Sequence, residues 1–102
     1  MDFYVIRRPS AWRNQEELKA AKAKFAEVAE EMSGRLRWIR SYVVDEADGR
    51  LGSFSIYQAQ DADSIRELTR RVGMPAAEFY RVNSNLIANE DSPEISSTSP
   101  TK

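Results

Sequence analysis

The sequence predicts a small α+β domain with its elements in the order β-α-β-β-α-β. Two observations indicate this order: apolar residues recur at helical spacing in two segments, and β-rich or alternating runs occupy four others. The chain has 102 residues, of which 41% are hydrophobic and 30% charged, so it has room for one core. We expect one domain over residues 1–88 and a disordered tail over 89–102, rich in Ser, Thr and Pro.

The first half of the chain predicts a strand, a helix and a second strand. The first strand follows from the β-rich run 3–6 and is expected to end before Pro9, with a loop over 10–13. Asn14 is the expected N-cap of the first helix, and Gly34 is expected to end it in a left-handed conformation. Its apolar stripe consists of Leu18, Ala21, Phe25, Val28, Ala29 and Met32.

The second half predicts a hairpin, a second helix and a last strand. Strands over 36–44 and 51–59 meet at an Asp48-Gly49 turn. A helix capped by Asp61 or Asp63 carries the apolar stripe Ile65, Leu68 and Val72 and ends at Gly73, and a further helical turn is expected over 75–78. A last strand is expected over 79–87. This order is that of the ferredoxin-like fold, a four-stranded antiparallel sheet with two helices on one face.

The alternation of strand side chains divides the sheet into two faces. We assign Ile39, Val43, Phe54 and Ile56 to the face covered by the helices. The opposite, open face is then expected to carry Trp38, Arg40, Tyr42, Ser53, Ser55 and Tyr57. An uncovered face with several aromatic residues requires cover. We therefore expect a homodimer in which two sheets pack face to face, as in a dimeric α+β barrel.

Charge and composition exclude several classes of function. Fifteen Lys and Arg against sixteen Asp and Glu give a net charge of −1, so we expect no nucleic-acid partner. The chain has no Cys and no His, which removes the usual ligands of transition metals and the commonest general base. We therefore expect no metal site and no cofactor. No basic and apolar leader and no membrane-spanning run is found, so we expect a cytoplasmic location and no membrane partner.

The candidate ligand-binding residues are aromatic and polar side chains expected on the open face. They are Trp38, Arg40, Tyr42 and Tyr57, with Arg81 and Asn83 from the last strand. Aromatic walls, phenol hydroxyls and a guanidinium suit a small aromatic or anionic ligand. The same residue types are enriched at protein interfaces, so the face can equally form the dimer contact. We interpret the arginines at 66, 70 and 71 as a solvated helix face, with Glu67 paired to Arg71.

The functional hypothesis is a non-catalytic small-ligand-binding or accessory protein, because no nucleophile and base are paired in the sequence. One alternative is a cofactor-independent enzyme of the oxygenase or isomerase type, with Tyr42 or Tyr57 as an acid and Arg40 stabilising an anion. Another is an interaction module that uses the same sheet face.

Four stretches of the chain also resemble a known family. They are Phe3-Tyr4-Val5-Ile6, residues 38–43 with Asp45, Tyr57-Gln58-Ala59, and residues 65–76. Taken together, they resemble the domain-of-unknown-function 4242 family over residues 2–86. The resemblance implies a ferredoxin-like fold, a dimer formed by sheet-to-sheet packing, and a metal-binding alternative, because one bacterial relative binds nickel. This chain departs from the family pattern at Gln58, where a Glu is common, and at Leu68, where a His is common.

Overall fold

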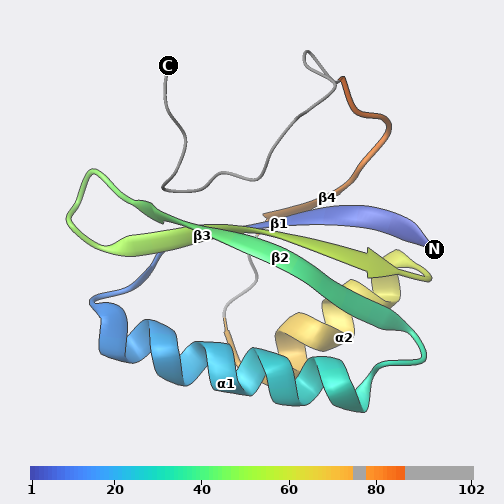
Figure 1. The fold of residues 1–102 in the computed structure, drawn as a ribbon, viewed down its shortest axis with the longest axis horizontal. Coiled ribbons are helices and arrows are strands. Elements are labelled where there is room, and N and C mark those ends of the chain that lie inside the picture. Colours follow the sequence, from blue (N-terminus) through green and yellow to red (C-terminus); the bar gives the residue numbers. More distant parts are fainter. Residues whose placement is uncertain (75–77, 87–102) are drawn as a thin grey trace, which may run out of the picture.

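The computed structural model describes residues 1–74 and 78–86 and contains the six expected elements (Figure 1). These are β1 (Asp2–Trp12), α1 (Gln15–Glu31), β2 (Leu36–Asp45), β3 (Leu51–Ala59), α2 (Ala62–Val72) and β4 (Glu78–Arg81). The strands form one antiparallel sheet in the order β2-β3-β1-β4, and both helices lie against the same side of it (Figure 1). The ferredoxin-like fold is therefore confirmed. The expected tail over 89–102 lies outside the described residues, as does the expected helical turn except for Glu78, which begins β4.

The helix ends follow the expected signals with one exception. The Asn14 side chain accepts a hydrogen bond from the backbone N–H of Glu17 at 3.0 Å, and the Asp61 side chain accepts one from the N–H of Ser64 at 2.8 Å. Gly73 ends α2 with φ 74°, a conformation that glycine adopts without steric cost. The expected role of Gly34 is wrong, because Met32 caps α1 and Gly34 does not have a positive φ.

Strand β1 is longer than the sequence predicts. It continues past Pro9 to Trp12 through an irregularity between Arg8 and Trp12, where Ser10 has φ 49°. Proline is tolerated there because β4 pairs only with residues 4–7 of β1, so no neighbour on that side needs the missing N–H. The extension brings Trp12 under the sheet instead of leaving it in a loop. Strand β4, in contrast, ends at Arg81 rather than at residue 87.

The core lies between the two helices and the sheet. Side chains from both helices and from the sheet are almost fully buried in it: Tyr4, Ile6, Val28, Met32, Leu36, Tyr57, Ala59, Ile65 and Leu68. Each large apolar side chain buried in this way contributes roughly 1.5–3 kcal/mol to stability. The apolar stripes predicted from helical spacing supply the helix side of this core.

The predicted division of the sheet into faces is partly wrong. In β2, Trp38 pairs with Tyr57 and Arg40 pairs with Ile56, so Ile39 is an extra residue that shifts the register. Tyr57 is 1% exposed and belongs to the core, whereas Phe54 on the same strand is 40% exposed. Phe54 and Ile56 therefore lie on the side away from the helices, together with Arg40. The assignment of Val43 to the helix-facing side is correct, since it pairs with Ser53.

The side of the sheet away from the helices carries apolar side chains among charged ones such as Arg7 and Arg40, and it has no helix on it in the described part of the chain (Figure 1). Its apolar residues are Phe3, Val5, Tyr42, Val44, Phe54, Ile56 and Tyr80, and we call this surface the open face. Phe3 is 45% exposed and Tyr80 is 58% exposed. Over the residues described, neither helix has the length and apolar character needed to cross a membrane.

Candidate functional site

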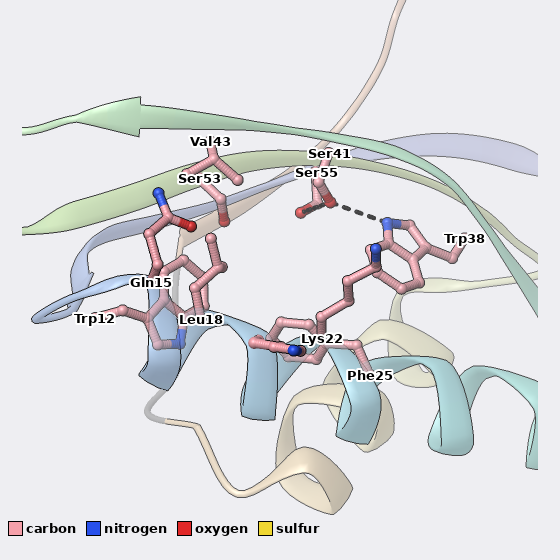
Figure 2. A pocket seen from close by; sticks show the side chains of 11 residues that line it. Trp12, Gln15, Leu18, Lys22, Phe25, Trp38, Ser41, Val43, Ser53 and Ser55 are labelled. Atoms are coloured by element: carbon pink, nitrogen blue, oxygen red, sulfur yellow. Dashed lines mark hydrogen bonds between the residues drawn. The ribbon is translucent and has the colours of Figure 1, made fainter.

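A cavity of about 530 Å³ lies between α1 and the helix-facing side of the sheet (Figure 2). Its volume falls within the range of small-molecule sites, roughly 300–1,000 Å³. Figure 2 shows Trp12 and Trp38 at opposite ends of the cavity, Phe25 on the helix side and serine side chains on the sheet side. The lining residues are Trp12, Gln15, Leu18, Lys19, Lys22, Phe25, Trp38, Ser41, Val43, Ser53 and Ser55.

The cavity exists because small side chains face large ones across the helix–sheet interface. Strand β3 turns Ser53 and Ser55 toward α1, and their short side chains leave space that Leu or Ile would fill. Aromatic rings stand beside this gap. Phe25 makes edge contacts with Trp12 and Trp38 at centroid distances of 6.3 and 6.1 Å.

Serine hydroxyls on the sheet side are available to a ligand. The indole N–H of Trp38 donates to Ser41 Oγ at 2.9 Å, and the Oγ atoms of Ser41 and Ser55 lie 2.6 Å apart. Only one of the two hydroxyl protons can lie between those oxygens. The other has no acceptor among the described residues, and the Ser53 side chain makes no hydrogen bond there either. The cavity wall therefore offers free O–H donors.

Arg8 is a buried charge next to this wall. Arg8 is 3% exposed and pairs across the strands with Ser53, which lines the cavity. Its Cζ lies 4.7 Å from the ring centroid of Phe25. Its Nε and Nη2 atoms are buried without a hydrogen-bond acceptor in the described structure, and no carboxylate pairs with it in that part of the chain. Burial lowers the pKa of the guanidinium, because removal from water disfavours the charged form.

Trp12 contributes a second unsatisfied donor. It is 3% exposed and lines the cavity, and its indole Nε1 is buried with no acceptor among the described residues. The charged residues that line the cavity are Lys19 and Lys22, and no Asp or Glu belongs to the lining. The polar groups around the cavity are thus mainly donors, and its charge is positive.

The structure does not bring the predicted site residues together. Trp38 lines the cavity, and Tyr57 stacks on it from within the core, with ring centroids 6.2 Å apart and an interplanar angle of 10°. Arg40 and Tyr42 lie on the other side of the sheet, where Arg40 Nη1 is 3.4 Å from the Tyr42 hydroxyl. Burial raises the pKa of Tyr57 to about 12. The phenol therefore stays protonated at neutral pH.

The last two predicted residues lie at the β4 edge. Arg81 Nε donates to a carboxylate oxygen of Asp2 at 3.1 Å, and Asn83 is exposed beyond the end of β4. Sequence reasoning did not select Arg8 or Trp12. A signal for Arg8 was present, because it follows Tyr4 and Ile6 at the period of two that places side chains on one face.

The donor set of this chain does not fit nickel. The sequence contains no imidazole and no thiolate, which are donors that nickel favours. Within residues 1–74 and 78–86, no three Asp or Glu side chains gather as a possible metal site. Glu46 and Glu67 are instead paired with arginines: Glu46 lies 2.9 Å from Arg7, and Glu67 lies 2.7 Å from Arg35. These arginines lower the pKa of both carboxyls.

Comparison with known proteins places the chain in a family. Neither the curated proteins nor the solved structures contain a match to it. A family model described as nickel-responsive protein SCO4226-like matches residues 4–82. The match spans the fold from β1 past the end of β4 and includes every residue that lines the cavity. The chain therefore belongs to the SCO4226-like nickel-responsive protein family.

Proposed function

We propose that this chain is a small-ligand-binding protein that holds an organic molecule in the cavity between α1 and the sheet. The cavity of about 530 Å³, lined by both tryptophans of the chain, carries the proposal. Ligand sites typically combine apolar walls with a few polar groups that orient the ligand, and the free serine hydroxyls supply such groups. Because the donor set does not fit nickel, we assign the ligand to organic molecules.

A binding role is better supported than catalysis. The chain has no His or Cys, and no carboxylate lines the cavity, so a general base is missing at the place where a substrate would sit. Tyr57, a candidate acid of the enzyme alternative, lies in the core rather than in the cavity lining. The family name, which describes a response to nickel, also fits an accessory role rather than an enzymatic one.

The proposal includes a homodimer formed through the open face. The exposure of Phe3, Phe54 and Tyr80 on that surface supports it, because large apolar side chains that gather on an exposed surface mark interaction sites. A second copy of the same sheet is a partner of matching shape and polarity. Since the cavity is on the other side of the sheet, pairing of two copies in this way leaves the ligand site accessible.

Binding of the neutral fluorescent dye N-phenyl-1-naphthylamine to the full chain tests the location of the site. Ser53→Leu projects an apolar side chain into the cavity, and we expect it to weaken dye binding about tenfold or more, because the dye and the new side chain cannot share the space. Ala23→Leu adds the same group on an exposed position of α1 and serves as the control. Equal binding by Ser53→Leu and the wild type would place the dye, and the ligand site, elsewhere.

A further inference from the structure

We propose that the ligand is an organic anion, an aromatic carboxylate in its simplest form, whose acidic group binds the cavity wall at Trp12 and Ser53, beside the buried Arg8. The inference rests on the proposed function and adds to it the charge class of the ligand. Three observations of different kinds support it: an uncompensated buried cation, an unsatisfied indole donor and the charge of the lining.

The uncompensated cation is the first observation. Arginines are almost never fully buried unless they are paired, yet Nε and Nη2 of Arg8 have no acceptor in the described structure. The preceding residue provides a comparison. Arg7 points to the other side of the sheet, is less buried, and is paired with Glu46 at 2.9 Å. Of these two neighbouring arginines, the more deeply buried one lacks a counter-charge in the described structure, and an anion in the adjoining cavity would place a negative charge beside it.

The indole of Trp12 is the second observation. The large majority of buried side-chain polar atoms have a hydrogen-bond partner. Trp38, at the other end of the cavity, follows this rule because its indole N–H donates to Ser41. Trp12 Nε1 is buried without an acceptor among the described residues, although Trp12 lines the cavity. An acceptor oxygen of a bound ligand would satisfy it.

The charge of the surroundings is the third observation. Lys19 and Lys22 on α1 add two positive charges to the lining, and no acidic side chain belongs to it. Positive charge around a recess of low dielectric constant raises the local concentration of anions. Arg8 adjoins the cavity through Phe25 and Ser53, both of which line it. A carboxylate at this wall would thus accept the free hydroxyl protons of Ser53 and of either Ser41 or Ser55 while lying next to this charge.

The aromatic walls indicate the rest of the ligand. Trp12, Phe25 and Trp38 line the same cavity, and the serine side chains lie on its sheet side, opposite α1 (Figure 2). Aromatic side chains favour offset-stacked or edge contacts with other rings. A flat ring system bearing one acidic group matches both the aromatic and the polar side chains of the lining.

Isothermal titration calorimetry with 2-naphthoate and 2-naphthamide tests the proposal, because the two probes share a ring and differ in charge. We expect the full-length chain to bind the carboxylate about tenfold or more tightly than the amide, since hydrogen bonds to charged groups are the stronger ones. Arg8→Met keeps an unbranched apolar side chain and removes the charge, and it should reduce the preference for naphthoate to near unity. Arg7→Met is the matched control and should keep the preference.

Two further variants separate the outcomes. Trp12→Phe should weaken naphthoate more than naphthamide, and it tests the wall independently if Arg8→Met fails to fold by circular dichroism. If Lys19→Gln with Lys22→Gln removes the preference while Arg8→Met retains it, the role of Arg8 is refuted. Equal affinity of the wild type for both probes would overturn the anion assignment and leave the binding cavity intact. Binding of neither probe nor the neutral dye would overturn the proposed function itself.

Discussion

Replacing Arg8 with Met is expected to stabilise the protein in the absence of ligand. The guanidinium is buried with two donor atoms that have no acceptor in the described part of the chain. Each unsatisfied buried donor costs about 1–3 kcal/mol, so two cost about 2–6 kcal/mol. The contact between Arg8 and the Phe25 ring at 4.7 Å offsets about 0.5–2 kcal/mol of this. Methionine retains most of the apolar packing of the arginine stem.

The net expectation is a gain of about 2 kcal/mol in the free energy of unfolding. For a domain of this size, that gain corresponds to a rise of about 10 °C in Tm. Urea denaturation and thermal unfolding, both followed by circular dichroism, measure the two quantities. Arg7→Met is the control on the same strand. It removes the ion pair with Glu46, and we expect it to lower the free energy of unfolding slightly.

A loss of stability in Arg8→Met would refute this reasoning. Truncation of an ordinary, well-satisfied buried side chain destabilises a protein, typically by about 1 kcal/mol or more. A loss of that size would mean that the guanidinium is compensated within the protein itself. The charge of Arg8 would then no longer support a ligand that supplies the counter-charge.

Three other perturbations test separate features. Burial raises the pKa of Tyr57 to about 12, so above pH 10 the folded state binds more protons than the unfolded state. The free energy of unfolding should therefore fall as the pH rises from about 10 to about 12. Tyr57→Phe should remove this pH dependence in urea titrations, and an unchanged slope in the variant would contradict the assignment. Gly52→Ala would place a Cβ 2.8 Å from the carbonyl oxygen of Arg8 and should lower the free energy of unfolding by about 1–3 kcal/mol in chemical denaturation. In the control Gly34→Ala the new Cβ meets nothing within 4 Å, so stability should be unchanged or slightly higher. Equal effects of the two substitutions would refute the steric reason. Phe54→Asp should convert the proposed dimer to a monomer in light scattering, because it buries a charge in the interface, and a dimer that persists would place the contact on another surface.

The order of elements could be predicted from the sequence because the local signals agree with the tertiary structure. The stripe that contains Phe25 and Val28 is buried in α1, and Ile65 and Leu68 are buried in α2. Gly49 has the positive φ of 86° that the hairpin turn requires. The predicted pairing of Glu67 with Arg71 on α2 is also confirmed.

The faces of the sheet could not be predicted in the same way. Strand β3 alternates Phe54 and Ile56 with serines, and hydrophobicity favours the larger apolar pair on the helix side. The structure instead has the serines on that side, where their short side chains line the cavity and leave it unfilled. The extra residue at Ile39 then places Trp38 and Arg40 on opposite sides, although they are two residues apart.

The candidate site depends on contacts that no local pattern encodes. Trp12 lines the cavity only because β1 continues past Pro9. The alternation of side chains along β1 was enough to place Arg8 on the helix-facing side of the sheet. Its lack of a partner, however, is a property of the folded chain, because it depends on which residues α1 and β3 bring next to it.

The indole N–H resonances of the two tryptophans offer the most direct test of an anion-binding cavity. Both tryptophans of the chain line the cavity, and a ¹⁵N-labelled sample gives each indole its own signal. Addition of 2-naphthoate should shift both signals, and the Trp12 signal should move downfield as its unpartnered N–H gains an acceptor. If both signals stay in place while backbone amides of the open face at Phe54 and Tyr80 shift, the ligand binds the other side of the sheet and the cavity is not the site.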